Sequence, residues 1–292
     1  MHPPSFPQLT PNMIGAYGPW GAARIGLEPG TLSLRHPDRR GSNLDRWRAD
    51  ARARVLQCMA PPAASGVPQT VTDARFVHDG VLIERLSWQL PYGPPTTGYL
   101  LKPADEQGPL PGILALHDHG GNKVFGSQKI VETGDDHPLM LEHRAGYYGG
   151  VAWANQLAKR GYVVLVPDAF AFGSRRVRLA DVPLSLRQDP ADPSHILDDD
   201  ISSAAAIAAY NRWAGQHESI LAKSLFCAGT SWAGLFLSAD QRALDVLCAR
   251  PDVAADRVGC AGLSGGGLRT VYLGGLDPRI HCAVCVGMMT TW

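Results

Sequence analysis

The sequence lacks any charge imbalance, since its 292 residues contain 27 Lys and Arg and 27 Asp and Glu. A protein with no global field does not attract nucleic acid or an anionic membrane through its net charge, so neither partner is expected. The sequence also has no run of about 18 apolar residues, the length that a membrane helix needs. Its first residues show neither the basic segment nor the apolar segment of a signal peptide. These absences predict a cytoplasmic location without membrane contact.

Metal-type cysteine motifs are also missing. The six cysteines lie mostly in apolar runs, without CxxC pairs joined to partner histidines. Cys282 and Cys285 form a C-x-x-C, but in a strand they would point to opposite faces. The pattern therefore predicts buried thiols rather than a redox pair or a zinc site, and no cofactor is expected.

Periodicity divides the chain into an arm and a larger domain. Residues 1–41 have no sustained period and predict an irregular N-terminal arm, whereas residues 42–292 predict one α/β domain that begins with an amphipathic helix over 43–59. Alternating strands and helices predict right-handed βαβ units, and thus a mostly parallel sheet with helices on both faces. The expected strands cover 81–90, 96–102, 112–117, 162–167, 257–263 and 280–287, and the expected helices 151–160, 201–249 and 266–275.

The run Gly262-Leu-Ser264-Gly-Gly266 lies between a predicted buried strand and a predicted helix. A serine at such a sharp turn needs small neighbours two residues away on either side, because larger side chains would collide with the adjoining backbone. The helix N-terminus would then direct unpaired N–H groups at the serine. We therefore predict a nucleophile elbow, with Ser264 as the catalytic nucleophile.

A second glycine cluster, His117-Asp-His119-Gly120-Gly, follows the strand predicted over 112–117. An oxyanion hole needs two N–H groups near the nucleophile. We expect one from Gly265, the residue after the serine, and the other from the backbone of His119 or Gly120.

The runs HDHGG, GYVVLVPDAFAFGSRR, RALDVL and RVGCAGLSGGGLR resemble the α/β-hydrolase superfamily over about residues 42–292. They are most similar to its bacterial members of the dienelactone hydrolase and acetyl xylan esterase type. The resemblance implies a serine esterase that cleaves small carboxylic esters through an acyl-enzyme. It also implies a Ser–acid–His triad, with the acid after the strand that follows the last one here and the histidine later still.

The expected triad partners are absent from this chain. After Ser264 the sequence holds one acid, Asp277, and one histidine, His281. A helix of about ten residues would carry both of them ~15 Å from the serine, far beyond hydrogen-bond reach. The last strand would also leave a long apolar edge uncovered. We therefore expect a core truncated at its C-terminus, without its last strands and helices.

Several alternatives remain open at this stage. The chain could be a non-catalytic remnant that only binds a ligand or partner, or a metal-dependent hydrolase at His117 and His119. A histidine of that loop could also replace the missing base. Asp168 is expected to cap a loop or to lie at the edge of the substrate site, and the segment 229–233 to be a helix break rather than a second elbow. Arginines 175, 176 and 178 could hold a substrate carboxylate, although solvated loop charges are favoured; the oligomeric state stays open.

Overall fold

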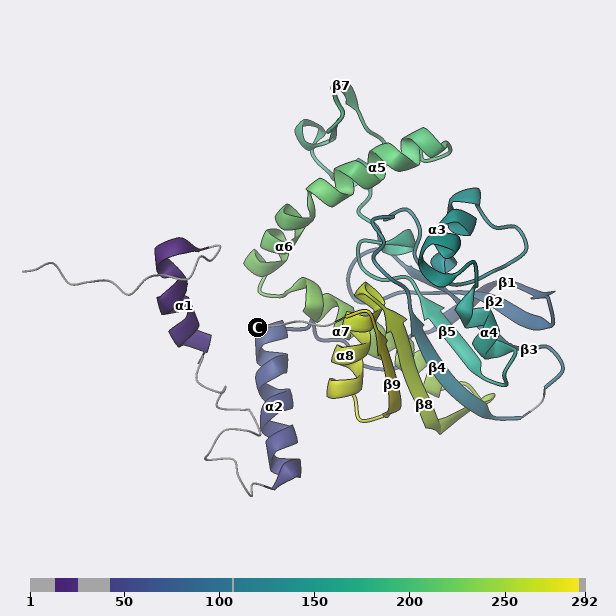
Figure 1. Ribbon diagram of the computed structural model, residues 1–292. Coiled ribbons are helices and arrows are strands. Elements are labelled where there is room, and N and C mark those ends of the chain that lie inside the picture. Colours follow the sequence, from purple (N-terminus) through teal and green to yellow (C-terminus); the bar gives the residue numbers. More distant parts are fainter. Residues whose placement is uncertain (1–13, 26–42, 107, 289–292) are drawn as a thin grey trace, which may run out of the picture. The chain divides into compact units, whose positions relative to one another are not determined.

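The computed structural model of the chain describes residues 14–25, 43–106 and 108–288 (Figure 1). The chain forms two compact units, Met1–Cys58 and Met59–Trp292, which we describe separately. The larger unit thus begins at Met59, whereas the sequence predicts a domain that begins at residue 42. In the first unit, a turn at Gly15–Tyr17 leads into α1 (Gly18–Ile25), so the arm predicted to be irregular is helical there. Pro19 suits the first turn of a helix, where no N–H bond is lost. The rest of the arm lies outside the described residues.

The helix predicted over 43–59 is confirmed as α2 (Leu44–Met59). Its N-cap is Asn43, whose Oδ1 accepts hydrogen bonds from the N–H groups of Asp45 at 2.9 Å and Arg46 at 3.2 Å. A side-chain amide at this position satisfies N–H groups that the helix itself leaves unpaired.

The second unit is built on a seven-stranded sheet with the order β1-β2-β3-β5-β4-β8-β9. Five strands point one way and β1 and β3 point the other, which confirms a mostly parallel sheet. The strands are β1 (Thr70–His78), β2 (Val81–Trp88), β3 (Thr96–Pro103), β4 (Leu110–Leu116), β5 (Val163–Pro167), β8 (Val253–Leu263) and β9 (Ile280–Val286).

Helices lie on both faces of this sheet, as predicted (Figure 1). On one face, α7 (Trp232–Cys248) and α8 (Gly265–Leu276) pack on the inner strands through a buried cluster that includes Leu114, Leu165 and Leu244. On the other, α4 (Trp153–Ala158) packs through Ala154 and Ala158. This burial of apolar side chains on both faces explains the continuous apolar sequences of β4 and β5.

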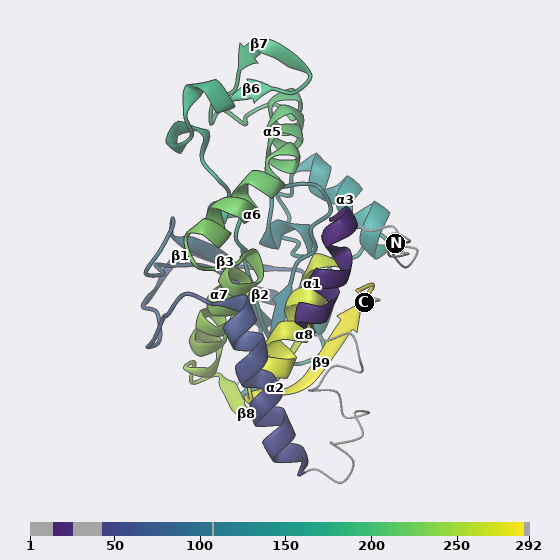
Figure 2. The ribbon, with the colours of Figure 1, turned by 90° about the vertical axis from the view of Figure 1, so that its left-hand side faces the viewer.

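The second unit differs from the prediction in several elements, of which the first is β1, where no strand was expected. Helix α3 (Pro138–Tyr148) was not predicted, and the expected loop over 169–200 contains short 3-10 turns and the hairpin β6 (Gln188–Asp189) and β7 (Asp192–Ile196). The hairpin lies beside α5 (Ala204–Gln216) (Figure 2). The region predicted as a long broken helix is α5, α6 (Glu218–Cys227) and α7. The region is broken twice, at His217, which was not expected, and at Gly229, as expected.

No single described helix is long and apolar enough to span a membrane; α6 and α7 reach that length and composition only as a pair, bent by 81°. Cys282 and Cys285 are exposed, so the prediction that they are buried was wrong, while Cys260 is buried.

Candidate active site

Ser264 is the single residue between the end of β8 and the start of α8. Its backbone has φ 54° and ψ −115°, a conformation that L-residues rarely adopt and that costs on the order of 1–3 kcal/mol. The side chain is exposed. Within the described part of the chain, the hydroxyl makes no hydrogen bond.

The two glycines that flank Ser264 are required by close backbone packing. A Cβ on Gly262 would lie 2.7 Å from the carbonyl oxygen of Leu116. A Cβ on Gly266 would overlap the same oxygen and lie 3.0 Å from the carbonyl oxygen of His117. The steric argument made from the sequence therefore holds, because β4 passes directly beside the turn.

The turn also brings Gly265 against the loop after β4. A Cβ on Gly265 would lie 3.0 Å from the backbone nitrogen of His119. Among the described residues, neither the N–H of Gly265 nor that of His119 has a hydrogen-bond acceptor. Two N–H groups without partners thus lie next to each other beside Ser264.

His117 is a buried structural residue. Its Nε2 accepts a hydrogen bond from the N–H of Ala169 at 3.2 Å, and its Nδ1 lies 2.9 Å from the carbonyl oxygen of Asp118. Burial, together with the positive charges of Arg269 and Lys129, holds the pKa of His117 well below its ordinary value. Both ring nitrogens are occupied, so His117 is not placed to act as a base for Ser264.

The ring of His119 is directed toward α6. Its Nε2 lies 2.6 Å from Glu218 Oε1 and 3.0 Å from Lys123 Nζ, and its Nδ1 accepts a hydrogen bond from the N–H of Gly121 at 3.1 Å. Lys123 also forms an ion pair with Glu218. Burial and the charge of Lys123 lower the pKa of His119. The ring of His119 is therefore also engaged elsewhere.

The donor set does not fit a metal at His117 and His119, because all four ring nitrogens already have partners. In residues 14–25, 43–106 and 108–288, no three His, Cys, Asp or Glu side chains are grouped as metal ligands.

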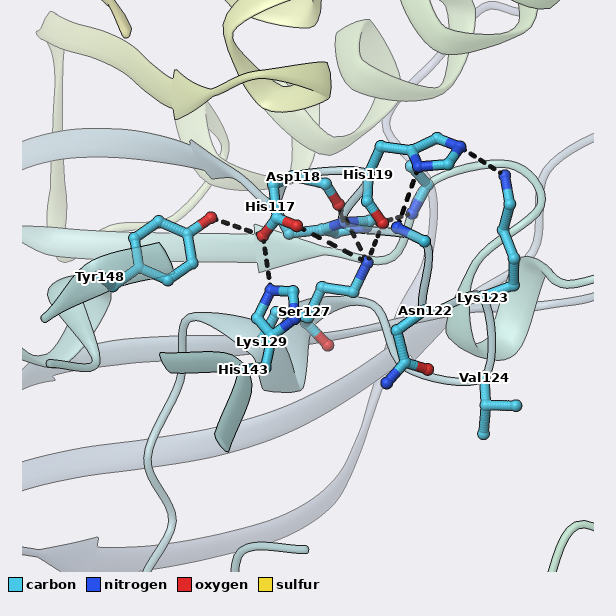
Figure 3. Close-up of polar contacts among 12 residues, drawn as sticks. His117, Asp118, His119, Asn122, Lys123, Val124, Ser127, Lys129, His143 and Tyr148 are labelled. Carbon is cyan, nitrogen blue, oxygen red and sulfur yellow. Dashed lines mark hydrogen bonds and ion pairs between the residues drawn. The ribbon is translucent and has the colours of Figure 1, made fainter. Parts of the chain in front are cut away.

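Beneath the loop, Lys129 and Asp118 form a buried network that the sequence analysis missed (Figure 3). Lys129 Nζ donates to the carbonyl oxygens of Asp118 at 3.0 Å and His119 at 2.7 Å. The Asp118 carboxylate accepts from His143 Nε2 at 3.1 Å and from the Tyr148 hydroxyl at 2.5 Å. Burial would raise the pKa of Asp118, but the hydrogen bond from His143, the charge of Lys129 and the hydrogen bond from Tyr148 lower it.

A cavity of about 410 Å³ opens beside Gly265 and His119. Its walls are mainly apolar and aromatic, and include Phe172, Trp232, Phe236 and Leu268. Arg269 also lines it, held by hydrogen bonds of 2.9 and 2.5 Å to the buried carboxylate of Asp240. Apolar walls with a few polar groups are typical of small-molecule sites.

Asp168 caps a loop, as predicted. Its carboxylate accepts hydrogen bonds from the N–H and hydroxyl of Ser127 at 2.7 and 2.8 Å, and from the N–H of Ser174 at 2.8 Å. Arg175 is buried, and its guanidinium donates to the carbonyl oxygens of Tyr92 and Pro94. The expectation of a solvated charge was therefore wrong for Arg175, whereas a role in holding a substrate carboxylate stays a prediction.

The structure places Asp277 and His281 away from Ser264, as expected. Asp277 follows the last turn of α8, where its carboxylate binds Arg279, and His281 lies at the start of β9. The expected helix break is also confirmed, because Ser231 caps α7 by accepting from the N–H of Gly234 at 2.9 Å.

Comparison with known proteins gives one curated relative and several structures. The relative is "Putative hydrolase YtaP" of Bacillus subtilis (strain 168), 27% identical over 190 residues, which are 65% of this chain and 46% of the relative. A structure described as "a putative acetyl xylan esterase" from Bacteroides fragilis NCTC 9343 has a TM-score of 0.57 and 21% identity, covering 81% of this chain and 51% of that one. The structure of the acetyl xylan esterase from Paenibacillus sp. R4 has a TM-score of 0.40 and 20% identity. That match covers 82% of this chain and 57% of that one. No protein-family model matches.

The Bacteroides structure shows that the chain has an α/β-hydrolase fold, as the sequence resemblance implied. The chain spans about half the length of the Bacillus relative and about half the length of the Bacteroides protein. It resembles hydrolases and esterases by sequence and by fold.

Proposed function

We propose that the chain is a serine hydrolase of carboxylic esters and that Ser264 is its nucleophile. The observation that carries this proposal is the strained turn of Ser264, φ 54°, beside the unpaired N–H groups of Gly265 and His119. Strain of this kind persists at functional positions where the surrounding structure enforces it.

In this mechanism the Oγ of Ser264 attacks the acyl carbon of the ester, and its proton passes to a base. The carbonyl π electrons move to the oxygen, which the N–H groups of Gly265 and His119 stabilise as an oxyanion. When the carbonyl forms again, the C–O bond to the alcohol breaks and the alcohol leaves with the proton. Water then cleaves the acyl-enzyme through the same steps. The 410 Å³ cavity beside Gly265 would hold the acyl group.

The base and its orienting acid are not provided by the described residues. The rings of His117 and His119 are engaged by other groups, Asp277 lies at the far end of α8, and His281 lies at the start of β9. The proposal therefore takes the histidine and acid of the triad from outside the described residues. The oxyanion hole and binding alone leave about 10³–10⁴-fold catalysis over water when triad members are removed.

The same lack of a base favours a second candidate function, in which the chain binds a small ligand in the cavity without cleaving it. Added imidazole distinguishes the two, because it can replace a missing histidine as base. We expect imidazole to stimulate hydrolysis of 4-nitrophenyl acetate by the chain, above the reaction of imidazole alone, and Ser264→Ala to abolish that stimulation. Equal rates for the chain and Ser264→Ala would favour the ligand-binding alternative.

A further inference from the structure

The N–H groups of His119 and Gly120, the two alternatives for the second oxyanion donor beside Gly265, share one buried partner. The N–H groups of His119 and Gly120 belong to the peptide groups whose carbonyl oxygens are those of Asp118 and His119. Lys129 Nζ binds both of these oxygens, at 3.0 and 2.7 Å (Figure 3). In a trans peptide the N–H points opposite to the C=O. Because the Lys129 amine holds both carbonyl oxygens, it also fixes the direction of both N–H groups.

We propose that Lys129 is a positioning residue of the oxyanion hole, which orients the two peptide groups and strengthens their N–H groups as donors through its positive charge. The inference rests on the proposed function, because it concerns the same N–H groups. A hydrogen bond to a charged amine polarises the peptide group, and a polarised N–H is a better donor to a developing anion.

The surroundings of Lys129 leave it few other roles. Its side chain is 0% exposed, and its amine also lies 4.4 Å from the centre of the Phe172 ring. The Asp118 carboxylate lies 4.0 Å away and is already bound by His143 and Tyr148. Lys129 thus contacts the loop mainly through its two carbonyl bonds, which are charge-assisted and stronger than neutral ones.

The geometry also predicts that kcat depends on pH, because a neutral Lys129 amine would keep its contacts but lose its charge. Burial lowers the pKa of Lys129 to about 7, while Asp118 opposes this shift. The charged or titratable groups that act on Lys129 from neighbouring elements, or that respond to its charge, are Asp118, Lys123, Asp168, Arg269, His117 and His119. Loss of the Lys129 proton above pH 7 should therefore weaken the oxyanion hole.

Lys129→Met tests this role, since it keeps an unbranched side chain of similar length without the amine. The matched control is Lys102→Met, which removes a largely buried lysine bound to Asp252 at 2.8 Å at another edge of the fold. With imidazole as base, we expect Lys129→Met to lower kcat for 4-nitrophenyl acetate about 100-fold with KM changed less than about threefold. Lys102→Met should stay within about twofold of the unchanged chain. A kcat for Lys129→Met equal to that of Lys102→Met would overturn the proposal.

The pH profile of the unchanged chain tests the role without any variant. At a constant concentration of free-base imidazole, we expect kcat to fall as the pH rises through about 7. A flat profile between pH 6 and 9 would contradict a role for the charge. The pH profile therefore tests the role of the Lys129 charge even if Lys129→Met does not fold.

A third measurement does not depend on turnover and separates failure of this inference from failure of the proposed function. With ¹⁵N-histidine labelling, we expect the backbone amide signal of His119 to shift with a midpoint near pH 7, in the unchanged chain and in Lys102→Met. The shift should be absent in Lys129→Met. The same titration in Lys129→Met would overturn the inference, whereas equal ester hydrolysis by the chain and Ser264→Ala would overturn only the proposed function.

Discussion

Gly266 lies so close to Leu116 that a Cβ on Gly266 would overlap the Leu116 carbonyl oxygen. Both partners are backbone, so neither can move without shifting β4 or α8. We expect Gly266→Ala to lower the free energy of unfolding by about 3 kcal/mol, as forced overpacking of a core does. Denaturant unfolding measures this loss.

Gly146 is the matched control for this substitution. It lies within α3, and a Cβ there would meet nothing within 4 Å. Gly146→Ala should therefore raise the free energy of unfolding by about 0.5–1 kcal/mol, because alanine favours helix more than glycine does. Similar effects of the two substitutions would show that the packing of Gly266 against β4 is not what requires glycine.

The strain at Ser264 can be measured separately from its chemistry. Ser264→Gly and Ser264→Ala both remove the hydroxyl, but glycine alone accepts φ 54° without a steric cost. We expect the glycine variant to be more stable than the alanine variant by about 1 kcal/mol, and denaturant midpoints compare the two. An alanine variant that is equally stable would mean that the turn is not strained.

The sequence was sufficient to predict the elements on either side of Ser264, because their signals are local. The alternation of apolar strands and helices placed β8 and α8 correctly, and the glycine spacing predicted the crowded turn that the structure shows. The roles of Ser264, Gly265, His119 and Gly120 in catalysis stay predictions, as does the cytoplasmic location.

The network around Asp118 was not predictable in the same way. Tyr148 and His143 reach Asp118 from positions 30 and 25 residues later, on a helix that was itself missed. Glu218 reaches His119 across 99 residues. Hydrogen bonds between residues so far apart leave no periodic pattern in a single sequence. The hairpin β6–β7 was missed because its strands are short, Pro190 lies in its turn and Pro193 lies within β7.

Asp118 should make stability depend on pH in a defined direction. Its pKa in the folded chain lies below the ordinary value of 3.8, because hydrogen bonds from His143 and Tyr148 and the charge of Lys129 outweigh the effect of burial. A carboxyl with a lowered folded pKa contributes stability above its unfolded pKa and loses it as the pH falls. We therefore expect Asp118→Asn to cost about 2 kcal/mol at pH 7 and less below about pH 4.

Urea unfolding of the chain and of Asp118→Asn at several pH values between 7 and 3 measures this difference. Tyr148→Phe removes one of the three interactions and keeps the carboxylate, so it should cost about 1 kcal/mol. A cost of Asp118→Asn that stays constant down to pH 3 would contradict the assignment.

The cavity beside Gly265 should set the length of the acyl group that is accepted. Leu268 lines it from α8, so Leu268→Trp should fill part of the 410 Å³. We expect kcat/KM for 4-nitrophenyl hexanoate, relative to the acetate, to fall about tenfold. Val271 lies on the same helix with 51% of its side chain exposed, and Val271→Trp should leave the ratio unchanged. If Leu268→Trp left the ratio of kcat/KM for hexanoate and acetate unchanged, the acyl group would bind outside this cavity.

The site of covalent labelling by a fluorophosphonate tests directly whether Ser264 is the nucleophile. A phosphonyl group forms a bond to the nucleophilic oxygen of a serine hydrolase and places its own oxygen in the oxyanion hole. With imidazole present, we expect one adduct per chain, on Ser264 by peptide mass spectrometry, and none in Ser264→Ala. An unlabelled Ser264, or the same adducts in Ser264→Ala, would contradict it.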